Sequence, residues 1–195
     1  MGDPIFFDFP DSDIRYFPEF CSAEDAASQF SSLMVGTPWR NDKITVFGKT
    51  YDQPRLTAWY GEEGKSYSYS GIVMHPIPFT KLLSEIKAKV ESKTGERFNS
   101  CLLNLYRDGQ DSNGWHSDDE KELGKDPVIA SLSLGQTRMF HLRHKKDKTL
   151  KHKIELKTGS LLLMRGTTQH FWQHQLPKTK RKIDPRINLT FRSIQ

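Results

Sequence analysis

The heptapeptide Arg-Ile-Asn-Leu-Thr-Phe-Arg at positions 186–192 constrains the fold more than any other segment of this chain. Apolar and polar residues alternate strictly in it, and a period of two predicts a β-strand with one apolar and one polar face. The polar face consists of Arg186, Asn188, Thr190 and Arg192. Such a face suits a solvated sheet surface, or the inside of a barrel that binds a dicarboxylate through arginine. The strand alone does not separate these two interpretations.

A second strand with a polar face is predicted at residues 100–106. Asn104 and Tyr106 share one face of it, and Leu103 and Leu105 share the other. An amide and a phenol on one face are natural hydrogen-bond partners for the same carboxylates. An edge strand with a polar outer face is the alternative, but two such strands together favour a polar interior.

The remaining pattern predicts the fold class. A capping box at residues 22–25 precedes apolar residues at helical spacing, and a second helix is expected from about Thr80 to Lys93, before Gly95. Glycines divide the second half into short strands, which we expect near 100–106, 128–134, 138–143, 152–156, 160–164 and 186–192. Helices followed by many short strands indicate an α+β chain built on a jelly roll, or double-stranded β-helix.

Composition narrows the class of protein. The 195 residues suit one domain, and 35% hydrophobic with 27% charged residues supports a core and argues against disorder. No run approaches the ~20 apolar residues of a membrane-spanning helix, and the N-terminus lacks the pattern of a secretory signal. Cys21 and Cys101 form no CxxC pair, so we expect a reduced, intracellular protein without a zinc or disulfide framework.

Basic residues gather in the last third of the chain, although the net charge is only +5. The runs lie at residues 143–146, 148, 151–153 and 178–182. Such runs can neutralise phosphates, but the solvated loops of any basic protein look the same.

His116-Ser117-Asp118 is the first candidate for a metal site. Two ligands two positions apart can point the same way in extended backbone, and a second histidine would complete a 2-His-1-carboxylate face for iron. This face leaves positions open for oxygen and a cosubstrate. The spacing by itself often arises by chance. The candidates for the third ligand are His141, His144, His152, His170 and His174, of which the first three lie in or beside basic runs; spacing does not separate the last two.

Five segments of the chain form a further pattern. They are, in order, Asn104-Leu-Tyr106, His116-Ser-Asp118-Asp119-Glu120, Ile129-Ala-Ser-Leu-Ser133, Trp172-Gln-His174-Gln-Leu-Pro177 and Pro185-Arg-Ile-Asn-Leu-Thr-Phe-Arg192. Together they resemble the AlkB family of iron(II)- and 2-oxoglutarate-dependent nucleic-acid dealkylases. The resemblance covers roughly residues 14–195, so we expect no N-terminal extension that binds a partner. It implies a catalytic jelly-roll core at 99–195 and an extension at 1–98 with helices and nucleotide-recognition hairpins, packed on the core as one structural unit.

The resemblance also implies which residues bind the cofactors. His116, Asp118 and His174 would bind iron, with His170 as a neighbour. Arg186 and Tyr106 would bind the distal carboxylate of 2-oxoglutarate. The full set implied for 2-oxoglutarate is Asn104, Tyr106, Arg186, Asn188, Thr190 and Arg192.

The N-terminal part is similar to the branch of the family that repairs double-stranded DNA. Val46-Phe47-Gly48 resembles the hairpin wedge of that branch, where an aromatic side chain stacks in place of a flipped base; an ordinary core position is the alternative for Phe47. The positions that match the surroundings of the base pocket are Arg55, Tyr67, Tyr69 and Ser70. The base would lie between Tyr69 and His116. Tyr69 stands where phenylalanine is expected, which leaves base preference open.

Two further features match contacts with DNA. Asp119 corresponds to the family's contact with the substrate base, and Lys180, Arg181 and Lys182 correspond to a loop that grips the DNA backbone. The expected activity is oxidative demethylation of N1-methyladenine and N3-methylcytosine in DNA, which consumes 2-oxoglutarate and oxygen at iron(II), releases formaldehyde and restores the base.

The expected partner is duplex DNA with a flipped alkylated base, with single-stranded DNA or RNA as further options, no membrane, and a monomeric protein. The alternatives are the same chemistry on RNA or another substrate, and a non-catalytic jelly-roll module that binds nucleic acid. A module of that kind would not need a complete iron face and paired arginines. The expected location is the nucleus of a eukaryote or the cytoplasm of a bacterium.

Overall fold

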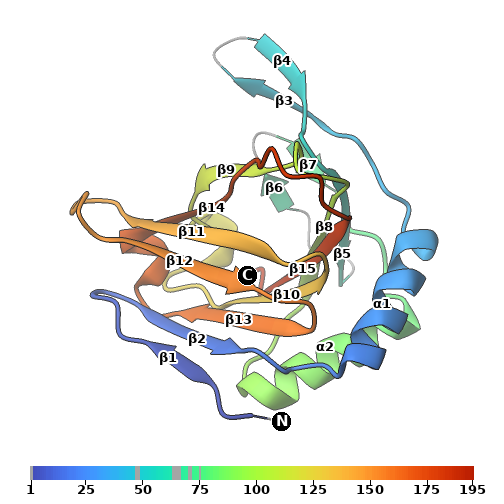
Figure 1. The fold of residues 1–195 in the computed structure, drawn as a ribbon, viewed down its shortest axis with the longest axis horizontal. Helices are drawn as coiled ribbons and strands as arrows, with labels where there is room; N and C mark the ends of the chain where they lie inside the picture. The colour runs from blue at the N-terminus through green and yellow to red at the C-terminus, as the bar shows by residue number, and fades with distance from the viewer. Residues whose placement is uncertain (1, 47–48, 63–66, 70–71, 75) are drawn as a thin grey trace.

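Two β-sheets form the body of the molecule in the computed structural model, which describes residues 2–46, 49–62, 67–69, 72–74 and 76–195. The larger sheet has the strand order β1 (Ile5–Phe7), β2 (Asp13–Phe17), β13 (Ser160–Arg165), β10 (Ile129–Gly135), β15 (Arg186–Arg192), β8 (Ser100–Tyr106) and β5 (Leu56–Gly61). The smaller has the order β12 (Lys151–Leu156), β11 (Arg138–His144), β14 (Trp172–Leu176) and β9 (Asn113–His116). The sheets face each other as the expected jelly roll (Figure 1).

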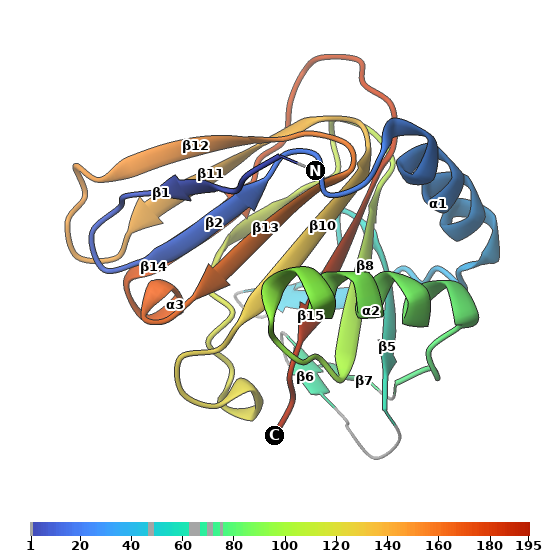
Figure 2. The same ribbon diagram turned by 90° about the horizontal axis from the view of Figure 1, so that it is seen from below.

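The apolar core has two layers. One lies between the sheets, where Ile129 and Leu162 of the larger sheet meet Leu142 and Leu156 of the smaller. The other lies under the helices α1 (Ala23–Gly36) and α2 (Lys81–Thr94), which cover the outer face of the larger sheet (Figure 2). Burial of each such aliphatic side chain contributes about 1.5–3 kcal/mol to folding.

Both predicted helices are confirmed, together with the signals that begin and end them. The Ser22 side chain caps α1 and accepts a hydrogen bond from the Asp25 N–H at 3.0 Å. Thr80 caps α2 in the same way, and the helix ends at Gly95, whose φ of +75° suits a residue without Cβ. The six predicted strands are also present, each within one residue of its predicted bounds.

Several elements were not predicted. These include β9 and β14, which carry the candidate metal ligands, β2, and the single-turn helix α3 (Thr168–Phe171). A short 3-10 turn at Lys121–Leu123 follows β9.

Two small hairpins stand apart from the main sheets: β3 (Lys43–Val46) with β4 (Lys49–Asp52), and β6 (Tyr67–Tyr69) with β7 (Ile72–Met74). The β3–β4 hairpin projects from the top of the molecule in Figure 1. The larger sheet joins β1, β2 and β5 of the expected N-terminal extension to strands of the expected core, and the boundary at residue 98 stays a prediction. None of the described helices is long and apolar enough to cross a membrane.

Candidate active site

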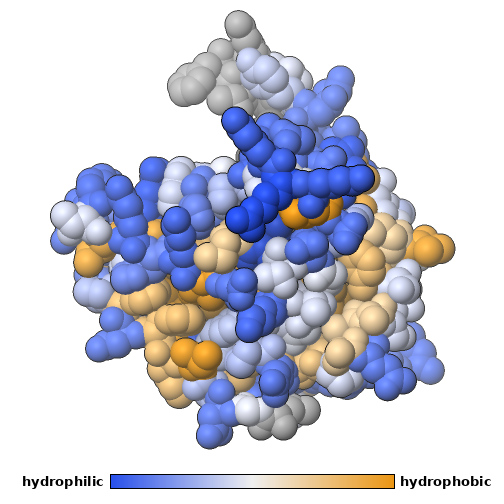
Figure 3. Space-filling model, in the orientation of Figure 1, coloured by the Kyte–Doolittle hydropathy of each residue, from blue (hydrophilic) through white to orange (hydrophobic). Residues whose placement is uncertain are grey.

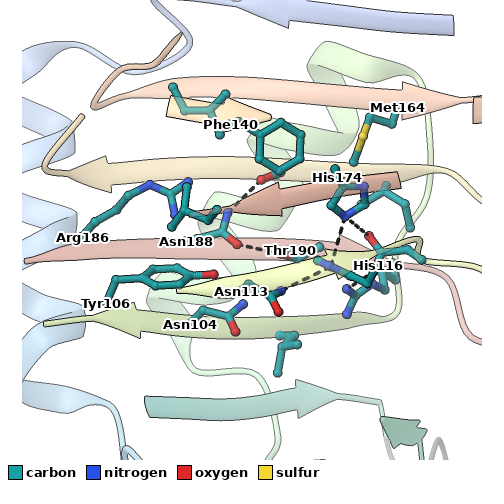
Figure 4. Close-up of a pocket in the computed structure, with 17 residues that line it drawn as sticks. Asn104, Tyr106, Asn113, His116, Phe140, Met164, His174, Arg186, Asn188 and Thr190 are labelled. Carbon is teal, nitrogen blue, oxygen red and sulfur yellow. Dashed lines mark hydrogen bonds and ion pairs between the residues drawn. The ribbon is translucent and has the colours of Figure 1, made fainter. Parts of the chain in front are cut away.

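Three side chains that can bind a metal converge between the two sheets. Figure 4 shows two of them, His116 and His174, pointing toward each other. His116 ends β9, Asp118 follows two residues later, and His174 lies in β14 directly opposite His116. The ligand atoms of the three residues lie within 4.8 Å of one another. The Nε2 atoms of the two histidines are 3.1 Å apart, and Asp118 Oδ2 is 3.7 Å from His174 Nε2. The sequence spacing did not decide between His170 and His174 as the third ligand. In the structure His174 joins the cluster, whereas His170 lies at the surface with its Nε2 2.8 Å from Asp126 Oδ1.

The geometry of the two histidines fits a shared metal ion. His116 Nδ1 lies 2.8 Å from the carbonyl oxygen of Gly114, which fixes the proton on Nδ1 and leaves the lone pair of Nε2 to bind a metal. Asn113 Nδ2 lies 3.2 Å from the same Nε2. Two ligands about 2.1 Å from one metal and at a right angle to each other lie roughly 3 Å apart. The 3.1 Å between the Nε2 atoms is therefore the separation that adjacent ligands of one metal require.

Electrostatics hold the three ligands in their metal-binding protonation states. Burial acts to raise the pKa of Asp118, but the neighbouring charges, above all that of Arg192, outweigh it and bring this pKa to about 2. Burial lowers the pKa of His116, and burial next to His116 lowers the pKa of His174 to about 3. At neutral pH the site thus presents one carboxylate and two neutral imidazoles, which are the forms that bind a divalent metal.

A residue that the sequence did not single out supports the carboxylate ligand. Gln169, in α3, is fully buried, and its Oε1 accepts a hydrogen bond from the Asp118 N–H at 2.9 Å. Ser117 Oγ donates to the carbonyl oxygen of Trp172 at 2.9 Å. The segment that leads into His174 therefore holds the segment that carries Asp118, and this coupling is possible only because α3 joins β13 to β14.

The polar faces of β15 and β8 form the wall of a pocket beside these ligands (Figure 4). The residues of that wall are Asn104, Tyr106, Arg186, Asn188, Thr190 and Arg192. The opposite faces of both strands pack in the core. The polar face of residues 186–192 is buried as well, so the solvated-surface interpretation of this strand is excluded. Arg186 is only 2% exposed and Arg192 3%.

Arg186 supplies the observation that fits 2-oxoglutarate. It lies opposite Tyr106 in the β15–β8 ladder, with its Cζ 5.4 Å from the centre of that ring. Its Nη2 donates to Ser133 Oγ at 2.9 Å, but its buried Nε has no hydrogen-bond partner among the described residues. Burial lowers the pKa of Arg186 to about 10, which still leaves it charged at neutral pH. A buried cation with a spare donor, in a pocket beside a metal site, suits the distal carboxylate of a dicarboxylate.

The other residues implied for 2-oxoglutarate have different surroundings. Asn188 is bonded within the wall: its Nδ2 donates to Ser131 Oγ at 2.8 Å, and its Oδ1 accepts from Thr190 at 2.9 Å. Arg192 binds the Oδ1 of Asp118. Ser131 and Ser133 belong to a segment that carries the family resemblance, but the sequence assigned them no role. They alternate with Leu132 and Leu134 in β10, and this period of two indicates the same polar wall. Phe140 and Met164, which also line the pocket, gave no such signal.

The residues expected to contact the base lie in several places. Asp119 is at the surface beside the ligands, with its Oδ2 3.0 Å from Lys145 Nζ. Arg55 is buried and donates from Nε to Asn104 Oδ1 at 2.8 Å. Phe47, Gly48 and Ser70 lie outside the described residues, as do the side chains of Val46, Tyr67 and Tyr69. These assignments stay predictions.

The basic run at 178–182 forms an exposed connection between β14 and β15. Figure 3 shows strongly hydrophilic side chains over this connection. Its base is fixed by Gly109, whose carbonyl oxygen accepts from the Thr179 N–H at 2.8 Å. A Cβ at Gly109 would lie 2.6 Å from the Thr179 carbonyl oxygen, so the close approach requires glycine. Lys180, Arg181 and Lys182 are thus held on a loop with a defined base.

The fold and the site define a class of protein, and the comparison with protein families agrees. The chain belongs to the 2OG-Fe(II) oxygenase superfamily, whose model matches residues 13–192. Membership implies iron(II), 2-oxoglutarate and oxygen, for which His116, Asp118 and His174 provide the metal site.

Particular relatives confirm the resemblance to the AlkB family. The chain is 47% identical over 186 residues to the bovine (Bos taurus) alpha-ketoglutarate-dependent dioxygenase alkB homolog 3, covering 91% of this chain and 64% of the relative. It is 41% identical over 159 residues to human (Homo sapiens) DNA oxidative demethylase ALKBH2, covering 78% of this chain and 61% of the relative. The chain thus spans just under two thirds of the length of these proteins. The solved structure of OsALKBH1 shares the fold, with a TM-score of 0.66 at 17% identity, over 92% of this chain and 97% of that one.

Proposed function

We infer that this protein is a dioxygenase that removes methyl groups from ring nitrogens of bases in DNA, with N1-methyladenine and N3-methylcytosine as its substrates. The observation that carries the proposal is the His116, Asp118 and His174 cluster beside a buried Arg186 with a spare donor. A protein that only bound nucleic acid would gain nothing from a buried cation next to a metal site, because burying an unpaired charge is costly.

The cofactors supply the oxidation, and the protein positions the reactants. When bound, iron and 2-oxoglutarate supply an oxidation in which oxygen converts the N-methyl group to N-hydroxymethyl while 2-oxoglutarate becomes succinate and carbon dioxide. The hydroxymethyl group then leaves as formaldehyde and restores the ring nitrogen. The chain contributes position: Arg186 and Tyr106 hold the far carboxylate of 2-oxoglutarate, and the three ligands hold the metal between the sheets.

The choice of methylated bases follows from charge. Methylation at these ring nitrogens makes both bases cationic, and the exposed carboxylate of Asp119 offers an opposite charge beside the metal ligands. Lost pairing lowers the cost of flipping the base out of a duplex. The exposed basic loop at 178–182 is suited to the phosphates of the same DNA.

The test is a single-turnover assay. Protein, iron(II), 2-oxoglutarate and a duplex with one N1-methyladenine are mixed anaerobically and then exposed to air, and formaldehyde, succinate and restored adenine are measured. We expect the three products in equal amounts, and none from Asp118→Ala, while the matched surface variant Asp126→Ala behaves like the parent. Succinate formed equally without DNA, and no restored base, would overturn the repair proposal. Faster turnover of the same lesion in RNA would replace DNA as the substrate.

A further inference from the structure

The environment of Arg55 differs from that of a residue that contacts a base. Arg55 is 3% exposed and does not line the pocket beside the metal ligands. Its Nε donates to Asn104 Oδ1 at 2.8 Å, and its Nη1 lies 3.4 Å from the carbonyl oxygen of Ser112. Arg55 thus lies behind the wall of the pocket, between β8 and the segment that leads to His116.

The strand register explains how Arg55 reaches this place. Thr57 in β5 pairs directly with Asn104 in β8. Arg55 lies two residues before Thr57, in the bend that leads into β5, and is therefore next to the end of the strand that pairs with β8. A long side chain from that position extends along the neighbouring strand and meets the Asn104 amide.

The bond to Arg55 decides which end of the Asn104 amide faces the pocket. Arginine has only donors, so the atom that it contacts must be the carbonyl oxygen of Asn104. The amide nitrogen, a donor, is then left for the pocket, where Figure 4 shows Asn104 beside Tyr106. Among the described residues, Arg55 is the only hydrogen-bond partner of the buried Asn104 side chain. Without Arg55, no other described side chain would hold this orientation by a hydrogen bond.

We propose that Arg55 is a positioning residue for the cosubstrate: it orients the Asn104 amide so that Nδ2 donates a hydrogen bond to 2-oxoglutarate. The inference rests on the proposed use of 2-oxoglutarate at this site. It assigns Arg55 to cosubstrate binding through Asn104 instead of direct contact with the base.

The test measures binding of 2-oxoglutarate without turnover, by anaerobic titration of the iron(II)-loaded protein and detection of the absorption that appears when a 2-oxo acid chelates iron(II). Arg55→Met should weaken binding roughly tenfold or more, since a charge-assisted hydrogen bond then no longer fixes the amide. The KM for methylated DNA at saturating 2-oxoglutarate should stay unchanged. The matched control is Arg40→Met, an arginine whose side chain is 64% exposed, which should bind 2-oxoglutarate like the parent.

A double-mutant cycle separates positioning from general damage. Asn104→Ala should weaken binding of 2-oxoglutarate, and Arg55→Met added to it should have little further effect on that binding, because the proposed effect of Arg55 on 2-oxoglutarate is transmitted by the Asn104 amide. Additive losses would overturn the inference. Arg55→Lys keeps the buried charge but lacks the fixed Nε–H, so it should also weaken binding if Arg55→Met does not fold.

Other outcomes point elsewhere. Unchanged binding of 2-oxoglutarate with a raised KM for methylated DNA would make Arg55 a base contact and overturn the inference. No binding of 2-oxoglutarate by the parent protein would instead remove the proposed function itself.

Discussion

The guanidinium of Arg192 binds Oδ1 of Asp118, which leaves Oδ2 of the same carboxylate facing the Nε2 of His174 at 3.7 Å. Both residues are almost fully buried. One oxygen of the Asp118 carboxylate therefore binds Arg192, and the other faces the remaining metal ligands. Arg192 fixes the rotation of the Asp118 side chain and offsets the cost of its burial before any metal binds.

Removal of Arg192 should therefore destabilise the metal-free protein more than the metal-loaded one. Arg192→Met leaves a buried carboxylate without its partner, which costs about 3–5 kcal/mol. A bound divalent cation replaces part of the lost charge. Urea denaturation with and without Mn(II) measures this, and Arg143→Met, a half-buried arginine over the Trp115 ring, is the control. An equal loss in both conditions would show that Arg192 does not act on Asp118.

The third metal ligand gives a sharp comparison between two nearby histidines. His174→Ala should abolish binding of iron(II), because His174 is buried within the ligand cluster. His170→Ala should retain it, because His170 lies at the surface with Asp126. Metal content after anaerobic loading and desalting distinguishes them. Retention of iron by the His174 variant together with its loss from the His170 variant would reverse the assignment.

The sequence predicted those parts of the fold that depend on local periodicity. The alternation in residues 186–192 correctly separated Leu189, in the core, from Arg186, in the pocket, because a period of two is a property of a single strand. The helix caps at Ser22 and Gly95 could likewise be predicted from the sequence, because a cap involves residues that are close together in the chain.

Features that depend on distant segments could not be predicted in this way. His116 and His174 are 58 positions apart, and only the pairing of β9 with β14 brings them together. Both strands are short, and their pairing is irregular between His174 and Leu176, so no long alternation marks them. The contact of Gln169 with Asp118 depends on α3 and has no sequence signature at all.

We expect Lys145 to affect the KM for methylated DNA, because it holds the Asp119 carboxylate in place. Its Nζ binds Asp119 Oδ2 at 3.0 Å and the carbonyl oxygen of Gln169 at 2.8 Å, which fixes the carboxylate relative to α3. Lys145→Ala should raise the KM for methylated DNA several-fold and leave binding of 2-oxoglutarate unchanged. The control with the same change in charge is Lys125→Ala, at an exposed position. Equal effects of the two variants would mean that only overall charge matters.

Glu91 should make stability depend on pH. Burial acts to raise its pKa, but hydrogen bonds from the Phe98 N–H and Lys87, with the charge of Arg97, bring it below the ordinary 4.5. A lowered pKa in the folded state gives stability that is present above the ordinary value and lost as pH falls through the lowered one. Glu91→Gln should therefore be less stable than the parent by roughly 1–3 kcal/mol at pH 7, with a difference that shrinks in acid.

Urea denaturation between pH 3 and pH 7 measures that difference. Glu85→Gln, on an exposed position of the same helix, should show almost none at any pH. A constant gap between parent and Glu91 variant would exclude titration of Glu91 as its cause.

The wedge assigned to Phe47 predicts a difference between duplex and single-stranded substrates. Phe47 lies outside the described residues, but β3 and β4 on either side of it form a hairpin that projects from the sheets. If Phe47 stacks in the gap left by a flipped base, Phe47→Ala should slow repair of a duplex much more than repair of the same lesion in a single strand, where no stack must be refilled. Rates on both substrates and a thermal unfolding curve of the variant test this. Equal losses on both substrates with a lowered unfolding temperature would place Phe47 in the core instead.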